Sequence, residues 1–370
     1  MTVNELNLKD FRNFSSERVT FDKGVNLIVG KNAQGKTNLI EAIYYLATGR
    51  SFRQAGDKDL ISFSQDSATI RAGVKSGERD QTLEARLFRG KRREIYANGS
   101  KLKKVSELTG RLAAVQFGPD DLDIVKGGAA TRRKLMDHCL SQLRPGYMAA
   151  LAEFNRLYGN KTRILRDYHD KPSLLELLDD FNIRIAEQSA RLMYYRTAFV
   201  SSLMRRAAEA HSNFSGCTET LSLRYKTVGG MDPTGKKTEQ LLLDLLEHQR
   251  ERYHAEIRSG MCLSGIQKDD IEILINGMQA QKYGSQGQMR TASVSIKLAE
   301  RDIHFDDKGE YPILLLDDVL SELDEIRQNF ILSTIAHGQV FITCCDEKAA
   351  SSANAEKVLY VEEGKLKNKM

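Results

Sequence analysis

The few, scattered cysteines and the lack of long apolar runs exclude several classes of protein. It has no tryptophan, 5 prolines and 5 cysteines in 370 residues, and the cysteines form no C-x-x-C pair. Neither a zinc knuckle nor a thioredoxin-type site is indicated, and the odd, scattered cysteine count suits a reducing cytoplasm. No apolar run approaches the roughly 18 residues of a membrane span, and the first residues lack the basic and apolar segments of a signal peptide. We therefore expect a cytoplasmic protein without a membrane span.

The composition indicates a globular chain large enough for two lobes. Hydrophobic residues make up 41% of it and charged residues 28%, which is enough for a sizeable core. The net charge is +5 and the pI is near 8.8. This mild basic excess permits a polyanion partner without proving one.

Hydrophobic periodicity divides the chain into three stretches. Residues 1–117 are β-rich around one helix, and their Asn98-Gly99 pair predicts a hairpin turn. Residues 118–257 repeat apolar residues mainly at helical spacing, with Leu221 to Tyr225 as a lone strand, and residues 258–370 return to strands. The nucleotide-binding signals described next lie at both ends. We therefore predict an α/β ATPase lobe, 1–117 and 258–370, interrupted by a mainly helical insertion, 118–257.

A phosphate-binding loop is the strongest single motif. Residues Gly30 to Thr37 read G-x-x-x-x-G-K-T, after the strand-like Val25–Val29 and before a helix-like run that starts at Asn38. In this context the loop backbone and the helix N-terminus bind phosphate oxygens. Lys36 would reach the β- and γ-phosphates, and Thr37 would ligate Mg²⁺. The sequence therefore predicts an ATP site with Mg²⁺.

A second motif supplies carboxylates for the same site. The apolar run Ile313 to Leu316 ends in Asp317 and Asp318, which is typical of a buried Walker B strand. Asp317 would hold Mg²⁺ and Asp318 would be the base that orients the attacking water. Two solvated acids at a strand end are the alternative, which the P-loop disfavours. We assign the catalytic roles to Asp318 and Lys36.

A polar loop before the Walker B strand completes the order of motifs. Residues Ser285 to Gln288 precede a predicted helix, where they are either an anion site or an ordinary N-cap. Leu320 to Asp324 follows Walker B in the place of a D-loop. The order insertion, polar loop, helix, Walker B is typical of the heads of ABC-type ATPases, so we expect a P-loop NTPase fold of that head type.

Several segments together resemble the bacterial RecF family. The matching segments, over about residues 1 to 348, are Phe11–Phe14, Asn26–Asn32, Gln34–Tyr44, Gly49–Arg53, Pro119–Leu122, Val125–Gly127, Arg132–Asp137, the Ser285 loop and Leu316–Asp324. The resemblance implies a head similar to those of Rad50 and SMC proteins, without their long coiled coils. It also implies slow ATP hydrolysis, ATP-dependent homodimers, DNA binding in repair and replication, and action with RecO and RecR in loading RecA at gapped DNA.

The resemblance assigns further site residues. In a dimer, Ser285 and the Gly287 backbone would contact the γ-phosphate of the opposite protomer, and Arg12 and Asn13 would lie near the nucleotide. Gln116 is a candidate Q-loop residue near the metal. The expected nucleotide-binding residues are Arg12, Asn13, Gly30, Lys31, Asn32, Ala33, Gln34, Gly35, Lys36, Thr37, Asn38, Ser285 and Gly287, with Thr37, Asp317 and Gln116 at the metal.

Basic clusters are candidates for contacts with the DNA backbone. They flank the Asn98-Gly99 turn or lie in the helical insertion, and they comprise Lys91, Arg92, Arg93, Lys101, Lys103, Lys104, Arg132 and Arg133. No pattern for reading bases is evident, so we expect salt-sensitive binding to phosphates, single-stranded, double-stranded or at junctions. A solvated charged surface is the alternative for each cluster.

The chain departs from the family pattern in two loops. RecF proteins usually carry Gly-Pro-His-Arg-Asp-Asp where this chain has Gly265 to Asp270, and Met289 stands where glutamine is commoner. Residues Thr343 to Asp346 take the place of a switch loop but contain no histidine. The alternatives are a divergent RecF-like ATPase, a P-loop enzyme acting on a small acceptor, a structural DNA clamp that senses ATP, or a transporter subunit, which would need a membrane partner.

Overall fold

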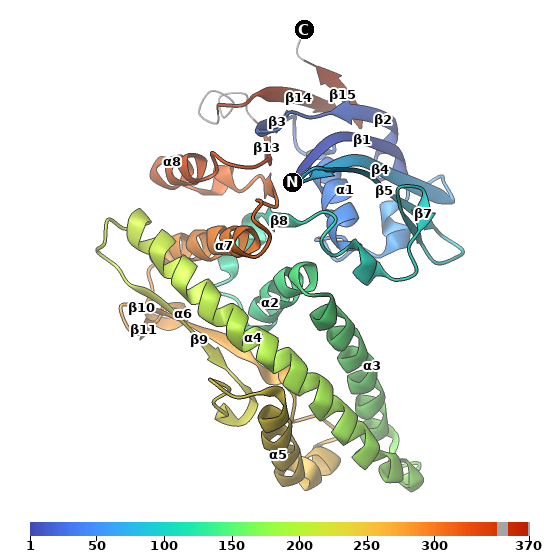
Figure 1. Cartoon of the computed structure of the whole chain (residues 1–370), viewed down its shortest axis with the longest axis vertical. Helices are drawn as coiled ribbons and strands as arrows, with labels where there is room; N and C mark the ends of the chain where they lie inside the picture. The colour runs from blue at the N-terminus through green and yellow to red at the C-terminus, as the bar shows by residue number, and fades with distance from the viewer. Residues whose placement is uncertain (346–353, 369–370) are drawn as a thin grey trace. The chain divides into compact units, whose positions relative to one another are not determined.

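The computed structural model describes residues 1–345 and 354–368, which form two compact units. The split unit comprises Met1–Asp123 and Ser293–Met370, and the inserted unit comprises Ile124–Ala292 (Figure 1). The inserted unit ends later than residue 257, where the sequence suggested a boundary. The reason is that β10 (Asp270–Ile275) pairs antiparallel with β9 (Leu221–Lys226), so β9 is not the lone strand expected.

The split unit contains two six-stranded sheets. One is antiparallel and runs in the order β2-β1-β4-β5-β6-β7; in the other, β15-β14-β3-β13-β12-β8, every pairing but β14–β15 is parallel. The strands of the first are β1 (Thr2–Phe11), β2 (Phe14–Thr20), β4 (Ser67–Ser76), β5 (Arg79–Phe88), β6 (Glu94–Ala97) and β7 (Ser100–Lys101). Those of the second are β3 (Val25–Val29), β8 (Ala114–Phe117), β12 (Ile313–Asp317), β13 (Val340–Cys344), β14 (Lys357–Glu362) and β15 (Lys365–Asn368).

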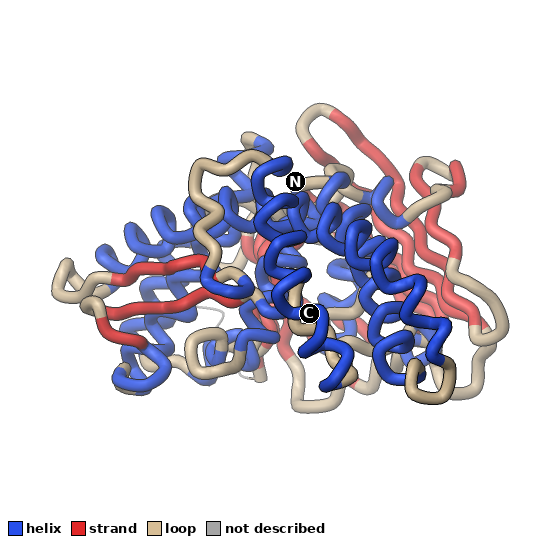
Figure 2. Tube along the Cα trace, turned by 90° about the horizontal axis from the view of Figure 1, so that it is seen from below, coloured by secondary structure: helices blue, strands red, loops and turns tan. Residues whose placement is uncertain are grey.

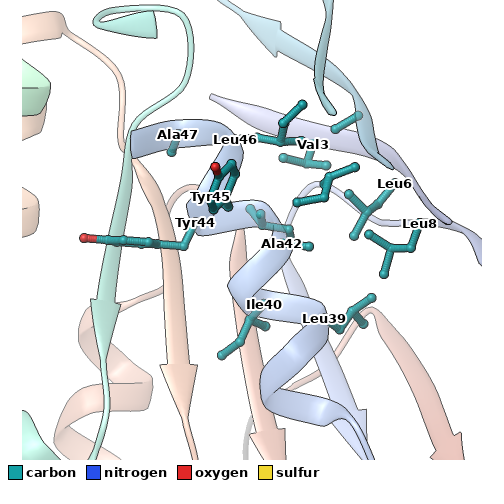
Figure 3. Close-up of a cluster of buried hydrophobic side chains, with 14 of the residues drawn as sticks. Val3, Leu6, Leu8, Leu39, Ile40, Ala42, Tyr44, Tyr45, Leu46 and Ala47 are labelled. Atoms are coloured by element: carbon teal, nitrogen blue, oxygen red, sulfur yellow. The ribbon is translucent and has the colours of Figure 1, made fainter. Parts of the chain in front are cut away.

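Helix α1 (Lys36–Thr48) forms the layer between these two sheets. One core cluster contains Leu39, Ile43 and Leu46 of α1, Leu6 of β1 and Phe341 of β13. Figure 3 shows α1 with its apolar side chains gathered near those of β1. A helix that is buried on nearly all sides follows from its sequence, since apolar residues recur around it. Its N-terminus is consequently held rigidly at the edge of the parallel sheet.

The other face of the parallel sheet packs on helices α7 (Gln286–Lys308) and α8 (Glu325–Thr334). Val294 and Leu298 of α7 and Ile331 of α8 join Leu314 and Ile342 in a second core cluster. Strands β3, β12 and β13 are therefore covered on both faces, which explains their continuous apolar runs.

The inserted unit is mainly helical, as the sequence indicated. Figure 2 shows helix (blue) dominating over a short ladder of strands (red) in this unit. Its elements are α2 (Ala129–Leu143), α3 (Pro145–Asp167), α4 (Leu178–Phe214), β9, α5 (Thr238–Ser259), β10, β11 (Met278–Gln279) and α6 (Ala280–Tyr283), and α7 begins in it. Short 3-10 helices lie at Asp57–Leu60, Val105–Leu108, Pro119–Asp123, Pro172–Leu177, Val228–Gly230, Ile266–Lys268 and Leu320–Glu322. No helix in the described part of the chain combines the length and the apolar character needed to cross a membrane.

Candidate nucleotide-binding site

The polar residues of both Walker motifs lie at the carboxyl ends of two parallel strands, β3 and β12, which flank a third. Strand β13 lies between β3 and β12, with Cys344 in register with Val29 and Asp317 in register with Thr343. The P-loop leaves the end of β3, and the Walker B carboxylates stand at the end of β12. This is the edge at which open α/β sheets bind ligands.

The P-loop backbone takes a conformation that suits an anion. Ala33 has φ 65° and Gly35 has φ 118°, in the left-handed half of conformational space. A side chain at Gly35 would also collide with Asn13, whose amide nitrogen would lie 2.7 Å from the added carbon atom. Backbone turns of this kind direct successive N–H groups into one concavity, where they bind phosphate. Glycine is thus required here for conformation and for space.

Asn13 and Asn38 brace this loop from outside. The Asn13 amide donates to the carbonyl of Gln34 at 2.8 Å, and the Asn38 amide donates to the Asn13 Oδ1 at 2.8 Å. The predicted nucleotide-binding residues Asn13 and Asn38 therefore lie at the loop, where the structure gives them a supporting role.

Lys36 points into the P-loop. Its Nζ donates to the carbonyls of Gly30 at 2.6 Å and Lys31 at 3.1 Å, and only 6% of the residue is exposed. The thiol of Cys345 lies 3.4 Å from the same Nζ and donates to the Asn32 Oδ1 at 2.9 Å. The ammonium group is thus held inside the concavity that the loop forms, where a phosphate would bind.

Thr37 and Asp317 meet, as expected for a metal site. The Thr37 hydroxyl donates to Asp317 Oδ1 at 2.8 Å, and the Thr343 hydroxyl donates to the same atom at 3.0 Å. Burial raises the pKa of Asp317, while the two hydroxyl bonds and the charge of Arg53 lower it. A desolvated carboxylate beside hydroxyl oxygens is an oxygen-only donor set, which fits Mg²⁺. A divalent cation would offset the cost of burying this charge.

Asp318 differs from Asp317 in its surroundings. It is partly exposed, and its backbone has φ 53°, a conformation that aspartate tolerates better than most residues. Its N–H donates to the Thr343 hydroxyl at 2.9 Å, and its carbonyl accepts from Ser321 at 2.6 Å. Both backbone bonds fix the residue and leave its carboxylate available to a water molecule.

Gln116 lies beside these groups without joining the Thr37–Asp317 pair. Donor and acceptor chemistry assigns its amide nitrogen to the side that faces Asp121, at 3.2 Å, and its oxygen to the side that faces the Gly118 N–H, at 3.0 Å. A side chain at Gly118 would come within 3.7 Å of the Asp317 carbonyl. Gln116 is thus a near neighbour of the site whose amide is bound to other groups.

Arg12 is engaged by a buried carboxylate. Its guanidinium donates to both oxygens of Glu41, at 2.9 and 3.0 Å, and to the Asp59 carbonyl at 2.9 Å. Glu41 lies in α1 and is fully buried, so removal of Arg12 would leave an uncompensated charge. The position expected to contact nucleotide therefore also anchors α1.

The structure adds three residues that the sequence did not single out as site residues. The Thr343 hydroxyl accepts the Asp318 N–H and donates to the Asp317 carboxylate. The Cys345 thiol contacts Lys36 and Asn32. Arg53 donates to the Asn38 Oδ1 at 3.1 Å. Thr343 and Cys345 lie in the expected switch loop and Arg53 in a segment that matches the family, but neither pattern assigns these side chains a contact. The expected switch loop extends to Asp346, which lies outside the described residues.

The polar loop of the inserted unit is a capped helix start. Ser285 precedes α7, its hydroxyl accepts the Gln288 N–H at 3.2 Å, and the Gln288 side chain accepts the Ser285 N–H at 2.8 Å. This reciprocal pair is a capping box. At Gly284 a side chain would lie 2.6 Å from the Ala280 carbonyl and 3.4 Å from Met289, so this glycine is required by close packing. Ser285 itself is exposed. We call Ser285–Gln288 the signature loop.

The Gly265–Asp270 loop, which departs from the family pattern, holds the inserted unit together. Asp269 is fully buried and accepts from Arg196 at 2.9 Å and from the hydroxyl of Tyr225. Burial raises the pKa of Asp269, an effect that the Arg196 charge opposes. Asp270 accepts a bidentate pair from Arg132 at 2.7 and 2.9 Å. Both acids of this loop are bound by residues of the same unit.

The same contacts speak against Arg132 as a DNA contact. Arg132 is only 6% exposed and also donates to two backbone carbonyls, and Arg133 donates to the Asp269 carbonyl at 2.7 Å. The basic run in the sequence predicted a phosphate-binding surface. That prediction was wrong for Arg132, because the burial of a side chain cannot be inferred from its charge alone. In the structure Arg132 is part of the core of the unit.

The hairpin cations of the split unit are more exposed. Lys91 and Lys101 approach Glu94 at 3.6 and 2.8 Å, and Arg93 pairs with Asp57 at 3.0 Å. Within the described residues, Arg92, Lys103 and Lys104 are exposed and form no ion pair. These three are the cations with the most freedom to bind phosphate.

The fold and this site define the class: the chain is an ABC-type ATPase. The model of the RecF/RecN/SMC N terminal domain matches residues 2–368. A solved structure of "the recombination mediator protein RecF-ATPrS in RecFOR pathway" superposes with TM-score 0.93 and 31% identity over 100% of this chain and 98% of that one. An Smc head domain from Pyrococcus furiosus, 16% identical with TM-score 0.55, shares the fold.

Curated relatives narrow the class to one family. The "DNA replication and repair protein RecF" of Halalkalibacterium halodurans is 36% identical over the full length of both chains. The protein of the same name from Acetivibrio thermocellus is 34% identical over 98% of each chain. The chain therefore belongs to the RecF family of DNA replication and repair proteins, and the resemblance inferred from its motifs is confirmed.

Proposed function

We propose that this protein is an ATP-gated DNA-binding protein in which two copies enclose two ATP molecules. The Walker half-site (Gly30–Asn38, Asp317, Asp318 and Thr343) of one copy faces the signature loop of the other. The observation that carries the proposal is the direct bond between Thr37 and Asp317, which joins the two Walker motifs into one site. The sheet edge, the P-loop backbone and Lys36 complete a site for a nucleoside triphosphate.

Thr37 and Asp317 are the residues that would hold Mg²⁺. No group of three or more His, Cys, Asp and Glu suited to a metal exists in residues 1–345 and 354–368, so the remaining ligands would be water and phosphate oxygens. When bound, the cation neutralises charge on the β- and γ-phosphates. Lys36 contributes a second positive charge at the same phosphates once it exchanges its bonds with the Gly30 and Lys31 carbonyls.

Asp318 is the residue proposed to orient and deprotonate the attacking water. Its carboxylate is partly exposed at the end of β12, while Asp317 beside it is buried. A carboxylate that keeps access to water acts as a base, whereas the buried one serves the cation. Such hydrolysis is slow and sets the lifetime of the ATP-bound dimer.

The signature loop is suited to complete the site in trans. Ser285 is exposed at the start of the 23-residue helix α7, and its hydroxyl accepts a bond from Gln288 while its own proton stays available as a donor. The helix N-terminus adds a partial positive charge toward an anion. Ser285 and Gly287 would therefore favour the ATP-bound dimer, and loss of the γ-phosphate would favour its opening.

We propose DNA binding on the basis of the family and of the exposed hairpin cations. The solved relatives carry the words "recombination mediator" and "RecFOR pathway" in their titles. We infer that this chain acts in the cytoplasm with RecO and RecR at gapped or junction DNA to help load RecA. Arg92, Lys103 and Lys104 are proposed to bind the DNA backbone.

Light scattering on the purified full-length protein, with and without ATP·Mg²⁺, tests this proposal. We expect ATP to convert monomers to dimers, and Lys36→Ala to abolish the conversion because it removes the cation at the phosphates. A fluorescent gapped duplex should bind more tightly in the presence of ATP. A wild-type protein that binds ATP but stays monomeric, even with DNA, would contradict the proposal and favour a P-loop enzyme acting on a small acceptor.

A further inference from the structure

A chain of side-chain contacts joins the end of α4 to the signature loop, all within the inserted unit. The Gln288 amide nitrogen donates to Glu219 Oε1 at 2.8 Å. The other oxygen of Glu219 lies 3.1 Å from His211 Nε2. His211 is in the last turn of α4, and Glu219 lies in the connection between α4 and β9. Three segments separated along the sequence therefore meet at one carboxylate.

The chemistry of the three groups fixes the direction of every bond in this chain. His211 is fully buried, burial lowers its pKa, and its Nδ1 has no hydrogen-bond partner. The neutral ring therefore carries its proton on Nε2 and donates it to Glu219, because a proton on Nδ1 would be a buried donor without an acceptor. A carboxylate only accepts, so Gln288 must turn its NH₂ group toward Glu219.

The direction of the Gln288 amide in turn sets Ser285. With its nitrogen bound to Glu219, the amide presents its oxygen to the Ser285 N–H, 2.8 Å away. The Ser285 hydroxyl then accepts the Gln288 N–H and directs its own proton away from the helix. If the amide turned over, its NH₂ group would face the Ser285 N–H, donor against donor, and the capping box would break.

We propose that Glu219, supported by His211, is a positioning residue that holds Ser285 in the geometry for contact with ATP in trans. This inference rests on the proposed function, because the contact exists only in a dimer. The arrangement connects α4 to the nucleotide in the dimer, because the last turn of α4 and the signature loop both bind the Glu219 carboxylate. A displacement of either side changes the hydrogen bonding of the other.

The test compares Glu219→Ala with the wild type and with Glu209→Ala as a matched control. Glu209 is also on α4 but is 62% exposed and contacts Arg206 at 3.5 Å. For Glu219→Ala we expect an ATP affinity of the monomer within about twofold of wild type, because that half-site lies in the split unit. We expect the ATP-bound dimer to weaken, and kcat to fall, by about tenfold, the loss of one charge-assisted bond and its network. Glu219→Gln keeps one acceptor for Gln288, so its dimer stability and its kcat should lie between those of Glu219→Ala and the wild type.

A mixing experiment separates positioning in trans from a defect in folding. Lys36→Ala lacks a working Walker half-site but keeps its signature loop, and Glu219→Ala has the opposite defect. Their mixed dimer contains one composite site with both halves intact, so mixing two poorly active variants should raise turnover well above that of either variant alone.

Three results would overturn the inference, and they are distinguishable. A Glu219→Ala protein that dimerises and turns over like wild type removes the role of Glu219. A mixture that stays as inactive as its components shows that Glu219 acts only within its own chain. A wild-type protein that never dimerises with ATP contradicts the proposed function itself, and the inference fails with it.

Discussion

The two halves of the proposed ATP site are built in different ways. The Walker half-site is assembled at the edge of a parallel sheet, where adjacent strand ends bring Thr37, Asp317 and Thr343 within hydrogen-bond distance. The signature loop is one helix start, and it is held by Gln288 and by Glu219 from another segment. The first half depends on sheet register, whereas the second depends on a few polar side chains.

The two halves should therefore respond differently to substitution. Strand register is fixed by many backbone bonds and a buried core, so one substitution changes the chemistry of the Walker half-site and leaves its position intact. The signature loop has fewer supports, and two of them are the side chains of Gln288 and Glu219. We therefore expect substitutions in the Walker half-site to alter binding and hydrolysis, and substitutions among the buried contacts of the inserted unit to alter geometry and stability.

The largest effect should come from Asp318→Asn in the Walker half-site. It removes the proposed base but keeps the shape of the side chain, so kcat should fall by roughly 10²–10⁴. ATP binding should persist and the ATP-bound dimer should live longer. Single-turnover hydrolysis and light scattering measure the two properties. A variant that neither retains ATP longer nor stays dimeric would show that Asp318 has another role.

In the inserted unit, Asp269→Asn should lower the stability of the fold and have no direct effect on catalysis. It leaves Arg196 without its fully buried carboxylate partner, with the partly exposed Asp137 remaining, and lowers the free energy of unfolding by about 3 kcal/mol. Urea titration measures this loss. Asp180→Asn is the control, since its 68% exposed carboxylate contacts Arg184 at 3.6 Å and a surface pair contributes about 0–1 kcal/mol. Equal losses in the two variants would refute the structural role of Asp269.

Acid should destabilise the split unit through His304 of α7. Burial lowers its pKa from 6.5 to about 4 in the folded protein. The unfolded chain therefore binds the proton first, and stability is lost as the pH falls from about 6.5 to about 4. At pH 5 this single group accounts for about 2 kcal/mol. Urea titrations at pH 7 and pH 5 should show a smaller pH effect in His304→Leu, and an unchanged one in the exposed control His254→Leu.

The smallest effect concerns DNA. Replacing the three unpaired hairpin cations by alanine should weaken binding about tenfold at 0.15 M salt and reduce the slope of log K against log salt by about 2–3. The substitutions are Arg92→Ala, Lys103→Ala and Lys104→Ala. A triple variant of paired surface cations in the inserted unit, Arg156→Ala, Arg166→Ala and Arg184→Ala, is the control. An unchanged salt slope in the hairpin variant would place the DNA interface elsewhere.

Short-range motifs explain most of what could be predicted. The P-loop and Walker B runs are contiguous, and each contains both its strand and its chemistry, so Lys36, Thr37, Asp317 and Asp318 were assigned without a structure. The Asn98-Gly99 turn between β6 and β7 is also a local feature, with φ 50° and 77° at the two residues. The boundary at 292 and the pairing of β9 with β10 were missed, because strand pairing between distant segments has no local signal.

The ATPase class, the two Walker motifs and the family could be recognised without a structure, because each is carried by residue type at fixed spacing along the chain. The roles of the remaining charged residues depend on contacts that form in the folded chain. Arg132 and Asp269 became core contacts, Arg12 an anchor for Glu41, and Glu219 a support for the signature loop. The physical reason is that a charge acquires its role from burial and from its partners, and both are set by segments far apart in the sequence.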